Sequence, residues 1–102
     1  MIGVSVMDKV QRMRKQIISQ FAGITIDMDY LLCIPAVHAT YQNQEIVVDF
    51  GGGLRKMTDG FPKDKADMVI RWVSLHRDEI GNNHYRIGHG IEPLLIIAPL
   101  SR

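Results

Sequence analysis

The chain has few of the features that would assign it at once to a functional class. It contains one cysteine, Cys33, among 102 residues, so no internal disulfide can form and a zinc site built from several thiolates is excluded. The formal net charge is +1, so no overall field draws the protein onto nucleic acid or an anionic membrane. The longest mostly apolar run, PLLIIAPL, is far shorter than the roughly 20 residues that span a bilayer.

Targeting and low-complexity segments are also lacking. The start of the chain, MIGVSVMDKVQRMRK, has neither the long apolar stretch nor the cleavage site of a secretory signal. The hydrophobic content of 46% and the charged content of 23% are those of a folded protein. We therefore expect a cytoplasmic protein with one α+β domain at residues 17–102, preceded by a helical extension at residues 1–16.

An amphipathic pattern predicts a helix at residues 5–20. Val6, Val10, Met13 and Ile17 recur at spacings of four, three and four residues, which places them on one helix face. This helix would be basic, and its cations form either a solvated face or a contact to an acidic partner or a phosphate backbone. The four basic residues are Lys9, Arg12, Arg14 and Lys15.

From Gly23 onward the apolar period changes to two, which is typical of strands. The predicted strands lie in the segments GITIDMDYLL, AVHATY, EIVVDF and, less regularly, LRKM. Three glycines at residues 51–53 predict a hairpin turn before the last of them. Because the connections are short, we expect an antiparallel meander of three or four strands.

One long helix is predicted at residues 62–80. Pro62 suits the first helical position, an apolar stripe runs from Ala66 to Ile80, and Gly81 stands where a helix commonly ends. Residues 82–90 have a loop-like composition, and PLLIIAPL predicts a last extended segment. The helix should pack on one face of the sheet and close the core of an α+β fold.

The polar residues give no assembled catalytic set. None of the four histidines lies at the i, i+4 spacing of a helical zinc site, and no serine has a nucleophile context, so neither a metal nor a cofactor is predicted. If Val37 and Ala39 face the core, His38 faces water or a partner. His76 lies on the apolar helix stripe, where a hydrogen-bonded histidine at the edge of the core is expected.

Trp72 and Leu75 flank the same stripe. They either widen the core or form an exposed apolar patch that a partner would cover. The candidate interaction surface is therefore Tyr41, Trp72 and Arg77.

Four segments resemble a small bacterial family named only as domain-of-unknown-function family 4160. IISQFAGITIDM is similar to the family's TISRFFGIVIRM, VHATYQNQEIVVDF to FHARYGEYEALIDI, and RWVSLHRDEIGNN to EWAELHREELLEN. The resemblance ends in EPLLIIAPL and covers roughly residues 17–100. The tryptophan helix with its Leu-His-Arg-acid-Glu run carries the most specific match.

The family usually has a Pro-Pro-His-aromatic-His run before its second strand. Here Ala36 stands in place of the first histidine and Val37 in place of the aromatic residue, while His38 and Tyr41 are kept. If the family's two histidines form a metal or acid–base pair, this chain has lost half of it. The resemblance thus favours a surface role for His38 over a catalytic one.

Members of this family resemble the products of short genes found beside another small gene. We therefore expect a non-enzymatic protein-interaction component of a two-gene, toxin–antitoxin-like module, with a partner encoded nearby. A homodimer formed through an uncovered sheet edge is a further expectation. Two alternatives stay open: an RNase-like hydrolase using His38 and His76 as acid and base, and nucleic-acid binding through the basic N-terminal helix.

Overall fold

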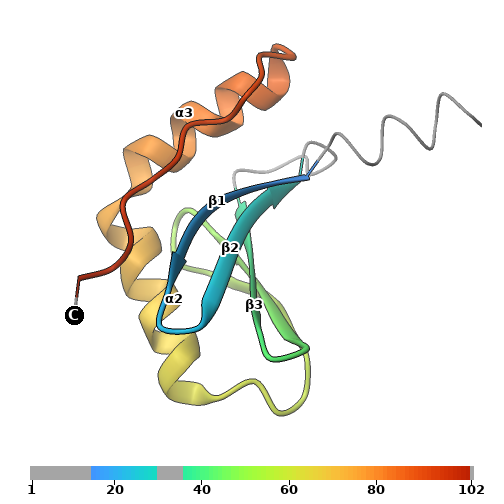
Figure 1. Ribbon diagram of the computed structural model, residues 1–102, viewed down its shortest axis with the longest axis vertical. Coiled ribbons are helices and arrows are strands. Elements are labelled where there is room, and N and C mark those ends of the chain that lie inside the picture. The colour runs from blue at the N-terminus through green and yellow to red at the C-terminus, as the bar shows by residue number, and fades with distance from the viewer. Residues whose placement is uncertain (1–14, 30–35, 102) are drawn as a thin grey trace, which may run out of the picture.

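The computed structural model describes residues 15–29 and 36–101. This part of the chain forms a five-stranded antiparallel sheet with two helices on one face (Figure 1). The elements in chain order are β1 (Lys15–Phe21), β2 (Ile24–Asp29), β3 (Ala36–Tyr41), β4 (Gln44–Asp49), β5 (Leu54–Met57), α2 (Lys63–Leu75) and α3 (Arg77–Gly88). The expected α+β class is confirmed, and the sheet has one strand more than the upper limit expected.

The sheet is a meander in which every strand pairs with its neighbour in sequence, in the order β1-β2-β3-β4-β5. Two-residue turns connect β1 to β2 and β3 to β4. Ala22 and Gly23 have φ of 52° and 79°, and Gln42 and Asn43 have φ of 48° and 67°. Positive φ at both central residues gives these turns the twist that antiparallel strands require.

The predicted N-terminal helix at residues 5–20 is wrong over its last turns, because Lys15–Phe21 is strand β1. Residues 1–14 lie outside the described part of the chain. The apolar residues of β1 differ in burial as expected for a strand: Ile18 and Phe21 are buried in the core, whereas Ile17 is half exposed. A β-bulge between Ile17 and Ser19 adds one residue to the strand, which hides the period of two from sequence inspection.

The predicted single helix at residues 62–80 is instead two helices with a break at His76. Pro62, predicted at the first helical position, is instead the residue that directly precedes α2. Helix α3 continues through Gly81 to Gly88, so the loop expected at residues 82–90 is wrong as far as Gly88. A Cβ at residue 81 would meet no heavy atom within 4 Å, so packing does not demand glycine there. Glycine lowers helix propensity by only about 1 kcal/mol, and the burial of Ile80 and Asn83 on α3 outweighs it.

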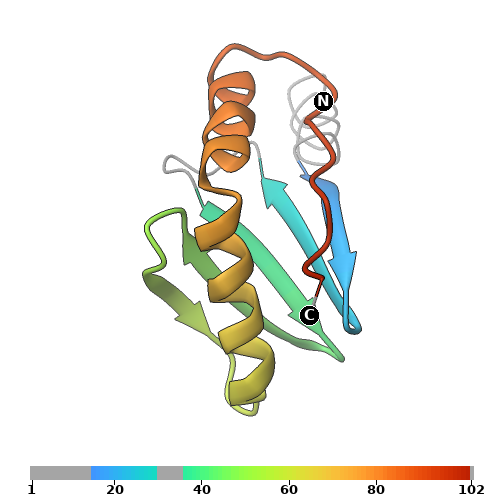
Figure 2. The ribbon, with the colours of Figure 1, turned by 90° about the vertical axis from the view of Figure 1, so that its left-hand side faces the viewer.

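The C-terminal segment, residues 94–100, runs along α3 and α2 beside β1 (Figure 2). Leu94 and Ile97 enter the core, and the Ile97 N–H donates to the Ile18 carbonyl at 2.8 Å. The extended segment expected from PLLIIAPL is therefore confirmed, although no strand is formed. It closes the β1 side of the core.

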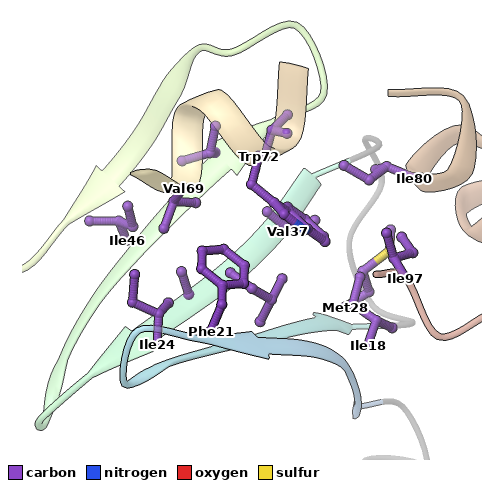
Figure 3. Packing of buried hydrophobic residues seen from close by; sticks show 14 of the residues in the cluster. Ile18, Phe21, Ile24, Met28, Val37, Ile46, Val69, Trp72, Ile80 and Ile97 are labelled. Carbon is purple, nitrogen blue, oxygen red and sulfur yellow. The ribbon is translucent and has the colours of Figure 1, made fainter. Parts of the chain in front are cut away.

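The core lies between the helices and one face of the sheet (Figure 3). Alternate residues of β2, β3 and β4 form the sheet side of the core, and Val69, Trp72 and Val73 of α2 form part of its helix side. Trp72 packs against Phe21 of β1 with ring centroids 5.7 Å apart. Removing this apolar surface from water drives the sheet and helices together.

Candidate interaction surface

His38 lies on the sheet face opposite the helices, in a row that crosses four strands. The pairing register places it between Asp27 of β2 and Val47 of β4, and Val47 beside Lys56 of β5. Its neighbours in β3, Val37 and Ala39, are buried in the core. The predicted orientation of His38 away from the core is thus what the structure shows.

Both ring nitrogens of His38 are engaged by carboxylates. Nδ1 lies 3.2 Å from both oxygens of Asp27, and Nε2 contacts Oε1 of Glu45. The other oxygen of Glu45 is 3.9 Å from the Lys56 ammonium. The hydrogen bond to Asp27 raises the pKa of His38, and Glu45 adds to the rise, although partial burial opposes it.

This arrangement favours a charged His38 held between Asp27 and Glu45 across three strands, which we call the cross-strand clamp. A general base needs a ring nitrogen open to the proton it abstracts, and here each nitrogen already has a carboxylate partner. The two carboxylates also lie at different nitrogens, so the three groups do not converge on one point. In the described parts of the chain no group of three or more His, Cys, Asp or Glu is placed to hold a metal ion.

His76 is in the helix layer, on the far side of the sheet from His38. It joins α2 to α3, lies 5.3 Å from the Trp72 ring by centroids, and contacts Glu79 through Nδ1 at 2.5 Å. The structure therefore does not bring His38 and His76 together. The acid–base pair of the RNase-like alternative would need them to share about one water, and the buried core separates them.

The three residues of the expected interaction surface are placed in different environments. Trp72 has no exposed surface and its indole donates to the Ala98 carbonyl at 2.8 Å. Of the two alternatives that the sequence leaves open for it, Trp72 therefore follows the first and widens the core, so it is not available to an interaction surface. Tyr41 is half-buried against Phe61. Arg77 is exposed at the start of α3.

The predicted basic N-terminal helix lies mostly outside the described residues. Lys9, Arg12 and Arg14 lie outside the described residues, and Lys15 begins β1. No helix in the described ranges is long and apolar enough to cross a membrane.

An exposed apolar surface is formed by the last helix and the chain that follows it. Tyr85 of α3 and Ile91 and Leu95 of the chain that follows line a shallow hollow whose polar margin is Asn82 and Arg86. Ile96, next along the segment, is 72% exposed. We call Tyr85, Ile91, Leu95 and Ile96 the C-terminal apolar surface.

The helix that carries this surface has a signal in the sequence. Ile80, Asn83 and Ile87 continue the α2 pattern at spacings of three and four residues. Such spacing is typical of one helix face, so a search for the pattern beyond Gly81 could have revealed α3.

Buried hydrogen bonds hold the C-terminal apolar surface in position. The Asn83 side chain, which is fully buried, accepts from the Leu95 N–H at 2.7 Å and donates to the Leu95 carbonyl at 3.0 Å. Gln16 of β1 holds Leu94 in the same two-bond manner. Because the main chain of the segment is hydrogen-bonded by side chains on both sides, its backbone is held in place, and the side chains of Leu95 and Ile96 are exposed.

The geometry defines a small α+β protein whose helices cover one face of an antiparallel meander and whose apolar surface is carried by the last helix and the C-terminal segment. A family model matches residues 23–84, more than half of the chain, and its description is domain of unknown function (DUF4160). The chain belongs to this family. No curated protein and no solved structure matches it.

Proposed function

We propose that this protein is a non-enzymatic, cytoplasmic component of a bacterial two-gene, toxin–antitoxin-like module, and that it binds the protein encoded by the neighbouring gene. The observation that carries the proposal is the C-terminal apolar surface, in which Leu95 and Ile96 are 37% and 72% exposed on a held backbone. Exposed apolar surface of this kind, rimmed by polar groups, is characteristic of interaction sites.

The energetics of the surface favour a protein partner. Burying a leucine or isoleucine side chain contributes about 1.5–3 kcal/mol when it is fully exposed beforehand, and a rigid backbone reduces the entropy lost on binding. Tyr85 adds an aromatic side chain that is 58% exposed, and tyrosine is among the residues enriched at interface hot spots.

The engagement of His38 supports a role without catalysis. Its two nitrogens are held by Asp27 and Glu45, and His76 lies beyond the core with Glu79 as its partner. These contacts give each histidine a structural explanation. A hydrolase built on the two of them therefore has no geometric support.

The test is co-expression with the product of the neighbouring gene, followed by chromatography with light scattering. We expect a complex whose dissociation constant rises about tenfold or more in Ile96→Asp, because a hot-spot residue is worth about 2 kcal/mol. Leu75→Asp is the matched control, since Leu75 is also exposed (66%) but lines a different hollow with Ser74 and Arg77.

Two results would count against the proposal. One is a chain that remains alone after co-expression with its neighbour. The other is a complex that Ile96→Asp and Leu75→Asp weaken equally, because the C-terminal apolar surface would then have no special part in binding.

A further inference from the structure

The outer edge of β5 is a second surface with the features of a binding site. Within the described residues β5 is the last strand of the sheet and pairs with β4 alone (Figure 2). The Thr58 N–H donates to the Glu45 carbonyl at 2.9 Å. Since successive residues of a strand direct their N–H and C=O groups to opposite sides, those of Met57 point to the free edge.

An apolar shelf adjoins this edge on the helix side of the sheet. Leu54 and Met57 pair with Val48 and Ile46, whose side chains are buried in the core. However, the contacts that α2 makes with the sheet lie mainly on β3 and β4 in the described part of the chain. Leu54 and Met57 are therefore 46% and 52% exposed, although their strand partners are fully covered. A further strand beside β5 would extend the core over them.

The same edge carries two cations that are only partly neutralised. The Arg55 Nε donates to Asp49 at 2.9 Å, yet the side chain is 56% exposed. Lys56 is 64% exposed and 3.9 Å from a Glu45 carboxylate that also contacts His38. Each cation has room for a second carboxylate partner.

These charges decide which kind of strand would fit. In the symmetric antiparallel pairing that matches Leu54 of one copy of β5 with Met57 of another, Arg55 of one copy would oppose Lys56 of the other. Like charges directly opposite one another are destabilising, and exposed basic residues commonly protect an edge strand from self-association. An incoming strand with acidic side chains on one face meets no such repulsion.

We propose that the outer edge of β5 binds an extended, acidic segment of a protein partner by β-strand addition. The main chain of the segment pairs with Met57, its apolar residues cover Leu54 and Met57, and its carboxylates contact Arg55 and Lys56. This edge is at the opposite end of the sheet from β1, beside which the C-terminal segment runs. The proposal therefore does not rest on the C-terminal apolar surface.

The test measures binding of two labelled peptides of equal length to the full chain by fluorescence anisotropy. One peptide alternates valine with glutamate and the other alternates valine with lysine. We expect the glutamate peptide to bind and the lysine peptide not to bind. Met57→Pro removes an outward N–H without breaking the β4 ladder, as edge positions allow, and should weaken binding about tenfold, the effect of losing one or two net hydrogen bonds.

A charge-reversed variant provides the second arm. Arg55→Glu with Lys56→Glu should transfer the preference to the lysine peptide, and Arg71→Glu, an exposed cation of α2, is the matched control that should leave the preference unchanged. This arm decides the question if Met57→Pro fails to fold. Ile96→Asp should leave peptide binding intact, so this proposal and the proposed function can fail separately.

Three outcomes would overturn the inference. The first is that the glutamate peptide fails to bind, and the second is that it binds no better than the lysine peptide. The third is that the charge-reversed variant keeps the preference of the wild type. Sedimentation gives a further check, because a wild-type dimer that Met57→Pro converts to a monomer would assign the edge to a second copy of this chain.

Discussion

His38 shows how one side chain is defined by partners that are distant in sequence. Its own strand determines only the face to which it points. Asp27, 11 residues earlier, and Glu45, seven residues later, determine its charge by engaging both ring nitrogens. A protonated imidazole between two carboxylates is charge-complementary, whereas a neutral one leaves the buried Asp27 with a weaker partner.

This clamp predicts that stability depends on pH. Because the folded-state pKa of His38 is raised, its stabilising contribution is complete below the unfolded pKa of about 6.5 and is lost as the pH rises through the folded value. Urea titrations from pH 6 upward should show the free energy of unfolding falling across that window. In His38→Gln, which cannot gain the charge, this fall should disappear. A profile identical to that of the wild type would contradict the clamp.

Asp49 stabilises the glycine-rich turn between β4 and β5. With Phe50 and Gly51 it spells the metal-binding triplet of protein kinases, but its carboxylate accepts from the N–H groups of Gly51 and Gly53 at 3.0 and 2.9 Å. The bond from Gly53, aided by Arg55, lowers the pKa of Asp49. A Cβ at residue 53 would lie 2.7 Å from Asp49 Oδ2, so a side chain there would displace the Asp49 carboxylate from its present position.

At the scale of elements, the C-terminal segment is held mainly through side chains. Asn83 of α3 and Gln16 of β1 each make two hydrogen bonds to its main chain, and Trp72 of α2 adds one to Ala98. Three elements distant in sequence thus position one extended strip. Its outward residues form part of the proposed interaction surface.

Removing the Asn83 amide should loosen this segment. Asn83→Ala leaves the N–H and C=O of Leu95 without their partners, and we expect a loss of about 2 kcal/mol in the free energy of unfolding. Hydrogen exchange in residues 94–98 should also become faster. Asn82→Ala is the matched control, because Asn82 is exposed one position earlier on the same helix. Equal stability of the two variants would show that the Asn83 bonds contribute nothing.

The predictability of each element follows from how local its signal is. Strand β3 matches the predicted AVHATY segment residue for residue, because alternation in a hairpin with tight turns is a local pattern. Strand β1 was not predicted because its bulge interrupts the alternation of buried and exposed residues. Its pairing with β2 is a contact between two segments, which the helical spacing of apolar residues within one segment does not reveal. Helix α3 escapes prediction because Gly81 and the polar Asn82 and Asn83 suggest a loop, although Asn83 is buried with the main chain of Leu95 as its partner.

At the scale of the whole molecule, one core joins both helices, the sheet and the C-terminal segment. Trp72 is central to it, since its ring packs on Phe21 (Figure 3) and its Nε1 donates to the Ala98 carbonyl. The opposite sheet face carries the row from Asp27 to Lys56. The two proposed surfaces then lie at opposite ends of the same sheet, so a partner at one of them would not block the other.

Trp72 should therefore act on global stability. We expect Trp72→Ala to lower the free energy of unfolding by about 3–5 kcal/mol, a large part of the roughly 5–15 kcal/mol typical of a domain. Trp72→Phe keeps an aromatic ring and should lose less. Chemical denaturation followed by circular dichroism measures both changes. A Trp72→Ala protein as stable as the wild type would place the indole outside the core.

The sequence by itself determined the α+β class, the antiparallel order of the strands, the face to which His38 points and the start of α2. These features depend on neighbours within a few residues, so alternation, helical spacing and Pro62 suffice to specify them. Only the tertiary structure decided that residues 15–21 form a strand, that Trp72 is buried, that His38 has two carboxylate partners and that Ile96 is exposed. Each of these depends on contacts between distant segments, and a local pattern that fits two environments cannot choose between them.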